Sequence, residues 1–188
     1  MFPTGQPRDV IDGIEVSCVD VAMPMMIARA ADLGIGGYET QEALDAMPEL
    51  FARMEALRIK AGALMGFGDV TKSVVPKLGL IAPAQGDAHF AVRYFMPWTT
   101  HPTVAVTGSQ CLAACALAPG TVAEGMVRAI DASPAVVTME HPMGTLDVLV
   151  KYETGAEGFS FVSAGVTRTA RLIARGEVLV PASVWGGA

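Results

Sequence analysis

The chain has 188 residues, of which 52% are hydrophobic and 17% charged, and 13 Lys and Arg against 19 Asp and Glu give a net charge of −6. An acidic chain without a basic cluster excludes a typical nucleic-acid-binding protein. No run of about 20 apolar residues is present, which excludes a conventional transmembrane helix. We therefore expect one soluble domain, and the apolar composition predicts a large buried contact with another polypeptide.

The cysteines and the first residues indicate the compartment. Cys18, Cys111 and Cys115 form neither an even disulfide framework nor a zinc-binding pattern. Residues 1–12 contain two prolines and a glycine in place of the apolar run of a signal peptide. Both features predict a cytoplasmic location.

The first half of the chain reads as strands, helix, strands. An alternating run with β-branched residues, 14–21, and an apolar run, 25–30, are predicted as two strands joined at Ala22-Met23-Pro24. Thr40 begins a helical pattern that restarts at Pro48 and continues to Leu64. The pattern then predicts strands over 77–82 and 90–96.

The second half continues with a helix and further strands. The pattern predicts a helix over 101–117, closed by Pro119-Gly120, and strands over 135–140, 146–152 and 159–164. Residues 169–181 predict a short helix followed by a strand over 177–180. Because strands and helices do not alternate regularly, the fold class is α+β.

The helix predicted at 101–117 is apolar on almost every face. Such a helix must be buried on all sides, and the simplest architecture is a curved, mostly antiparallel sheet wrapped around it. Its alanines and cysteines suit close contact with the surrounding strands. Inert packing is the default interpretation for Cys111 and Cys115, which stand four residues apart in it.

The beginning of this helix is polar. A buried helix N-terminus leaves up to four amides without partners and carries a partial positive charge. Two interpretations stay open at this point: Thr99, Thr100 and Thr103 could cap the amides, or Thr107, Gly108 and Ser109 could form a pocket for a carboxylate or phosphate. In the second interpretation Gly108 lets the ligand approach the backbone.

Other candidate ligand contacts are scattered. Met23 precedes a proline at a strand break, Lys72 and Ser73 lie in the loop after the long helix, and His101 contacts a ligand or caps the helix. His89 and His141 are interpreted as structural. Three dispersed histidines without a ligand spacing predict no metal site.

Three segments of the sequence resemble the PrpF-like proteins. They are IDGIEVSCVDVAMPMMIARAADLGIGGYE (11–39), RMEALRIKAGALMGFGDVTKSVVPK (53–77) and RYFMPWTTHPTVAVTGSQCLAACA (93–116). The resemblance implies the diaminopimelate epimerase fold, in which each of two domains is a sheet curled around a helix. It also implies a cofactor-independent isomerase that shifts a proton in an unsaturated polycarboxylate, and AMP at 22–24 is most similar to the 4-oxalomesaconate tautomerases.

The resemblance further implies how the site is assembled. Substrate carboxylates would lie at the helix N-terminus, near Thr107, Gly108 and Ser109. The chain corresponds to the second half of the family, and the lysine and cysteine that transfer the proton belong to the first half, while Ala105 stands where the epimerases keep a second cysteine. We therefore expect a single domain over 1–188, in which residues 165–188 belong to the fold of a first domain.

Three functional hypotheses follow. The first is a tautomerase module that acts together with a complementary first-half domain or as a homo-oligomer. The second is a carboxylate-binding or structural remnant without catalysis, and the third is a self-associating interaction domain. The sequence assigns no catalytic residue, cofactor or metal, and it leaves open whether the chain is active alone.

Overall fold

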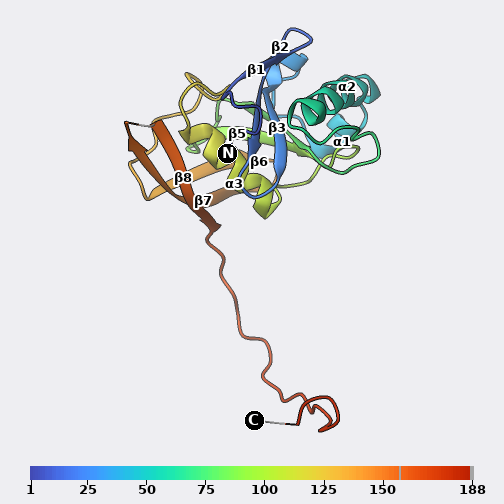
Figure 1. Cartoon of the computed structure of the whole chain (residues 1–188), viewed down its shortest axis with the longest axis vertical. Helices are drawn as coiled ribbons and strands as arrows, with labels where there is room; N and C mark the ends of the chain where they lie inside the picture. The colour runs from blue at the N-terminus through green and yellow to red at the C-terminus, as the bar shows by residue number, and fades with distance from the viewer. Residues whose placement is uncertain (157, 187–188) are drawn as a thin grey trace.

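One sheet organises the molecule (Figure 1). The computed structural model describes residues 1–156 and 158–186. The strands are neighbours in chain order: β1 (Asp9–Ile11), β2 (Ile14–Asp20), β3 (Pro24–Arg29), β4 (Lys77–Ala82), β5 (Phe90–Phe95), β6 (Ala135–His141), β7 (Gly144–Gly155) and β8 (Gly158–Val166). β3–β4 and β5–β6 pair in parallel, and the other neighbours pair antiparallel.

Helix α3 (Val106–Leu117) is the centre of the main core. It contacts β2, β3 and β4 toward one end of the sheet and β7 and β8 toward the other, so the sheet curves around it. Cys111, Leu112 and Ala113 are at most 1% exposed. The prediction of a mostly antiparallel sheet around a central helix is confirmed at this level.

A second layer covers the opposite face of β2–β5. It contains the 3₁₀ turn η1 (Ala30–Leu33), α1 (Gln41–Asp45) and α2 (Pro48–Leu64). Thr40 caps α1 by accepting a hydrogen bond from the Ala43 amide, and Pro48 is the first residue of α2. Both local predictions are confirmed, because a capping hydroxyl and a proline at the first helical position each act within one turn.

The predicted ending of the chain is wrong. Residues 167–181 contain neither the helix nor the strand expected there, and in Figure 1 this segment leaves the body as an extended trace. Leu172, Ile173 and Leu179 are 75%, 93% and 91% exposed. A short helix or lone strand needs an apolar surface to pack against, and these side chains have none in the described chain. Residues 187–188 of the predicted 165–188 segment lie outside the described residues.

Two further observations complete the architecture. The pattern missed β1, which a turn at Asp12-Gly13 joins to β2, both turn residues having positive φ. An Asp-Gly pair is the sequence signal for such a hairpin. Among the described residues, every helix is too short or too polar to span a lipid bilayer.

Candidate functional site

Helix α3 begins later than its sequence predicts. The helix starts at Val106, and residues 101–105 are not helical. Pro102 disfavours a helical conformation at His101, and a tight turn over 96–99 closes the bridge between Phe95 and Thr100. The polar residues before Val106 therefore form a loop that leads from β5 to the helix.

The first amides of α3 have no capping side chain. Ala105, the N-cap residue, has no side-chain acceptor, and the first amide with a backbone partner is that of Ser109, which donates to the Ala105 carbonyl. Among the described residues, the amides of Val106, Thr107 and Gly108 have no acceptor. They are three donors at the positive end of a twelve-residue helix.

None of the threonines proposed as caps accepts a hydrogen bond from the amides of α3. The Thr103 hydroxyl lies 3.3 Å from His101 Nδ1, and the Thr99 carbonyl accepts from the Met96 amide. Thr100 is 1% exposed and its hydroxyl has no partner in the described chain. The capping interpretation is therefore wrong.

Met23 lies against the start of α3. Its sulfur is 3.6 Å from the Thr107 hydroxyl and 3.8 Å from the Tyr94 hydroxyl, and its carbonyl accepts from Cys111 Sγ at 3.0 Å. Since a thioether is a weak acceptor, both hydroxyls keep most of their capacity to donate. The turn before β3 and the first turn of α3 thus form one cluster.

Tyr94 is the residue of this cluster that the sequence analysis missed. It is 1% exposed, and burial, followed by the neighbouring Cys111, raises its pKa. Phe90, Val92 and Tyr94 belong to the core around α3, whereas Ala91 and Phe95 belong to the other core. The alternation of β5 therefore contained the signal that Tyr94 faces the central helix.

Gly108 has a different role from the one predicted. A Cβ at this position would lie 2.2 Å from Tyr94 Cε2 and 3.0 Å from the Tyr94 hydroxyl. The missing side chain makes room for the tyrosine ring and not for a ligand. Only the Gly108 amide stays a candidate ligand contact.

Ser109 and His101 are held by local hydrogen bonds. The buried Ser109 hydroxyl donates to the Val106 carbonyl at 2.7 Å, so it serves the helix itself. The His101 amide donates to the Tyr94 carbonyl at 2.8 Å, and the His101 ring stands edge-on to the Tyr94 ring at 5.7 Å. His101 therefore joins the cluster of Met23, Tyr94 and Thr107.

Lys72 and Ser73 lie in the loop before β4, at the same end of the strands as the Met23 turn before β3. Their loop leads into β4, whose first residue, Lys77, pairs with Met25 next to the Met23 turn. The contacts of this loop run to Arg58, which is fully buried and donates to the carbonyls of Ser73, Val75 and Val70. Lys72 is exposed, and among the described residues no hydrogen bond joins Lys72 or Ser73 to the Met23 cluster.

Two cationic groups near this loop were not predicted. Arg58 pairs with Glu55 at 2.7 Å through two nitrogens and lies 5.9 Å from the Trp98 ring. Burial, and then the charge of Arg58, lower the pKa of Lys77. Position 58 lies four residues after Met54 and three before Ala61, both buried, so the helical spacing of α2 contained the signal that Arg58 is on the buried face.

The thiols and the other histidines have structural contacts. Burial raises the pKa of Cys18 to about 12 and that of Cys115 to about 11. Nδ1 of His89 accepts from the Thr138 amide, and Nδ1 of His141 accepts from the Met143 amide. Within residues 1–156 and 158–186, no three His, Cys, Asp or Glu side chains gather as metal ligands would.

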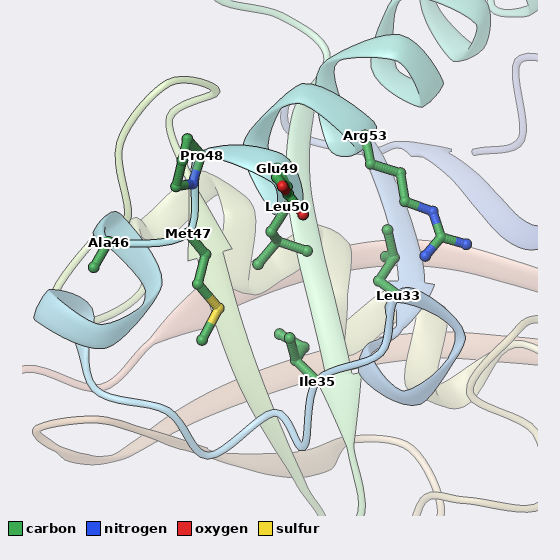
Figure 2. A pocket seen from close by; sticks show the side chains of 8 residues that line it. All are labelled: Leu33, Ile35, Ala46, Met47, Pro48, Glu49, Leu50 and Arg53. Atoms are coloured by element: carbon green, nitrogen blue, oxygen red, sulfur yellow. The ribbon is translucent and has the colours of Figure 1, made fainter.

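A cavity of about 500 Å³ lies on the other side of the sheet (Figure 2). Its lining residues are Leu33, Ile35, Ala46, Met47, Pro48, Glu49, Leu50 and Arg53. Leu33 and Leu50 belong to the core beneath α2 and not to the core around α3. The cavity is therefore separate from the Met23 cluster.

The fold matches that of a solved isomerase. The crystal structure of methylitaconate-delta-isomerase superposes with a TM-score of 0.75 at 23% identity, covering 88% of this chain and 50% of that chain. The part of that structure that matches the sheet around α3 is about half of its length. A family model described as "PrpF protein" matches residues 1–181, and the chain belongs to the PrpF family.

Two curated relatives of this chain are named as an isomerase and a tautomerase. The (4E)-oxalomesaconate Delta-isomerase of Novosphingobium sp. (strain KA1) is 37% identical over 180 residues, which are 96% of this chain and 50% of the relative. The 4-oxalomesaconate tautomerase of Pseudomonas putida (strain KT2440) is 35% identical over 187 residues, which are 100% of this chain and 51% of the relative. The chain spans about half the length of these curated relatives.

Proposed function

We propose that this chain is one module of an isomerase that shifts a proton in an unsaturated polycarboxylate such as 4-oxalomesaconate, without a cofactor. One observation carries the proposal: the first three amides of α3 have no acceptor in residues 1–156 and 158–186, and they lie beside Met23, Tyr94 and His101. The names of the two oxalomesaconate relatives support the substrate class.

The proposed chemistry uses these amides as anion receptors. A carboxylate of the substrate accepts from the amides of Val106 and Thr107, where the helix dipole favours negative charge. Removal of a proton from a carbon adjacent to a carboxyl group leaves an enolate-like anion, and a proton is then added at another carbon. Fixed amide donors stabilise that developing charge, and the loss of one such donor costs about 3 kcal/mol in known oxyanion sites.

The groups that move the proton are proposed to come from a complementary first-half domain. Burial raises the pKa values of the Cys18 and Cys115 thiols, so these thiols are poor acid-base groups near neutral pH. Residue 105, which would correspond to the second cysteine of the epimerases, is alanine. The chain would thus supply substrate binding and its partner the proton transfer.

Residues 165 and 166 of the expected 165–188 segment are the end of β8 and pair with β7 in this chain. We also propose that the described residues after β8, 167–186, belong structurally to that first domain. The segment carries Leu172, Ile173, Val178 and Leu179 fully in solvent in this chain. Val180, Val184 and Trp185 are exposed as well, and seven exposed apolar side chains in one segment are stabilised when another surface covers them. The complementary domain is the proposed surface.

A second function, carboxylate binding without catalysis, is favoured by the same alanine at position 105 and the same buried thiols. Both functions predict that a tricarboxylate binds, and they differ in turnover. The discriminating observation is therefore made with a first-half domain present.

The experiment combines the chain with the separately expressed first half of the Pseudomonas putida relative. Loss of the enol absorbance of 4-oxalomesaconate measures turnover, and calorimetry with cis-aconitate measures binding. Turnover only in the mixture supports the isomerase module, and binding without turnover supports the second function. Absence of both contradicts the two functions together.

A further inference from the structure

The hydrogen-bonding state of His101 is fixed by its loop. The Thr103 amide donates to His101 Nδ1 at 3.0 Å, and the Thr103 hydroxyl lies 3.3 Å from the same nitrogen. A backbone amide can only donate, so Nδ1 presents its lone pair and the hydrogen of the neutral ring is on Nε2. The loop that replaces the first predicted helical turn therefore selects one tautomer.

The position of the ring is fixed as well. The His101 amide donates to the Tyr94 carbonyl, and the two rings meet edge to face at an interplanar angle of 88°. Tyr94 in turn fills the space left by Gly108 in the first turn of α3. His101 is half-buried, and among the described residues Nε2 has no hydrogen-bond partner.

We propose that His101 acts as a neutral Nε2–H donor to the anionic ligand of this site and not as its proton acceptor. The inference rests on the proposed function and assigns to one atom, His101 Nε2, the role of hydrogen-bond donor to the ligand. With hydrogen on Nε2, that nitrogen has no in-plane lone pair to take a proton. The lone pair on Nδ1 already accepts from Thr103, so the base must be another group.

His89 and His141 provide internal references for this inference. Both also accept a backbone amide at Nδ1, from Thr138 and Met143. Among the described residues, no hydrogen bond or ring contact joins His89 or His141 to Tyr94 or α3, and the role of ligand donor is therefore assigned to His101 alone. The shared geometry means that all three rings are expected in the same tautomer.

The tautomer is tested by long-range proton–nitrogen spectra of the chain labelled with ¹⁵N-histidine at a pH where the ring is neutral. The expected result is an Nε2–H tautomer at His101 in the unmodified chain and in Thr103→Val, which keeps the amide. Thr103→Pro removes the amide donor and is expected to populate the Nδ1–H form. The signal of His89, whose ring is held by the Thr138 amide, should not change and reports that the variant is folded.

The donor role is tested by binding of cis-aconitate. His101→Gln places an amide N–H where Nε2–H was and has no useful proton affinity, while His101→Leu removes the donor. We expect Gln to bind within a few-fold of the unmodified chain and Leu to bind roughly 10- to 100-fold more weakly, the range for a hydrogen bond to a charged group.

Each outcome decides between the claims. An Nδ1–H tautomer at His101, or Gln binding as weakly as Leu, overturns the inference even if aconitate binds the unmodified chain. Absence of aconitate binding together with absence of turnover in the mixture with the first-half domain, with the Nε2–H tautomer observed, overturns the proposed function and with it the ligand role, while the fixed tautomer stands.

Discussion

The α-carbon of Gly108 lies so close to the ring of Tyr94 that a Cβ at position 108 would be 2.2 Å from Cε2. Contacts below 3 Å between such carbons do not occur in folded proteins without displacement of one partner. The buried ring of Tyr94 also contacts His101 and Met23. The first turn of α3 and the site residues around it are therefore positioned by one tyrosine.

The first prediction concerns this contact. Gly108→Ala should lower the free energy of unfolding by about 1–3 kcal/mol, the usual cost of overpacking a core, measured by denaturant titration. Gly165→Ala is the control, because a Cβ there meets no atom within 4 Å and should change stability little. Gly108→Ala combined with Tyr94→Leu should show a favourable coupling energy. Additive losses would contradict the contact.

The second prediction removes one amide donor. Val106→Pro replaces the first residue of α3, where proline is well tolerated, and Ala105 before it is already extended (φ −66°, ψ 146°). The helix should remain, and cis-aconitate binding should weaken about tenfold or more, because one donor to a charged group is lost. Val106→Ala keeps the amide and should bind like the unmodified chain. Equal binding by Pro and Ala variants would mean that this amide does not contact the ligand.

Local signals in the sequence predicted much of the fold, and non-local contacts account for the errors. The Thr40 cap and the restart at Pro48 were predicted correctly because each depends on residues within one turn. The predicted start of α3, at 101, is too early. The bridge between Phe95 and Thr100 shapes the loop before the helix, and the helical periodicity of the sequence does not reveal this bridge. The segment 169–181 has a real apolar pattern, but a pattern cannot say whether a surface covers it.

The site was predicted less completely for the same reason. Local features of the sequence predict Met23, His101 and Thr107 as ligand contacts, and the structure brings these three residues together around Tyr94. The role of Gly108 was misassigned because its neighbour in space is 14 positions away in sequence, on another element. Such pairings follow from strand register, which composition and periodicity do not determine.

The third prediction concerns Arg58, which is fully buried and donates to Glu55 and to three carbonyls of the 70–75 loop. Arg58→Met should destabilise the chain by about 3–5 kcal/mol, because it leaves buried acceptors and a partly buried carboxylate without partners. Arg58→Lys should recover only part of the loss, since an ammonium group cannot reproduce the planar fork of donors.

Hydrogen exchange distinguishes loop anchoring from a general loss of stability. Under conditions where Arg58→Lys remains folded, the amides of the 69–76 loop should exchange faster, while those of β7 should not change. Arg53→Met is the control. Arg53 is exposed, and in the described chain its side chain makes one hydrogen bond, to the Asp32 carbonyl. Equal exchange in the loops of the Lys variant and the control would exclude the anchoring role of Arg58.

The last prediction is a loss of stability at alkaline pH. Burial, and then the charge of Asp9, raise the pKa of Cys18 from 9.0 to about 12, and burial raises that of Cys115 from 9.0 to about 11. Between pH 9 and those values the unfolded chain has released the thiol proton and the folded chain has kept it. The free energy of unfolding should therefore fall as pH rises through this window, by up to about 1.4 kcal/mol per pH unit for each thiol.

Urea titrations between pH 8 and 11 measure this slope. Cys18→Ala should give a shallower slope than the unmodified chain, because its thiol no longer titrates on unfolding. Val19→Ala also removes a fully buried side chain, but it removes no titratable group and should keep the original slope. If Cys18→Ala and Val19→Ala both lower stability equally at every pH, the Cys18 thiol is not held in its neutral form by burial. A shallower slope for Cys18→Ala alone would show that the folded chain keeps that proton, as a fully buried thiol in the core beneath α2 must.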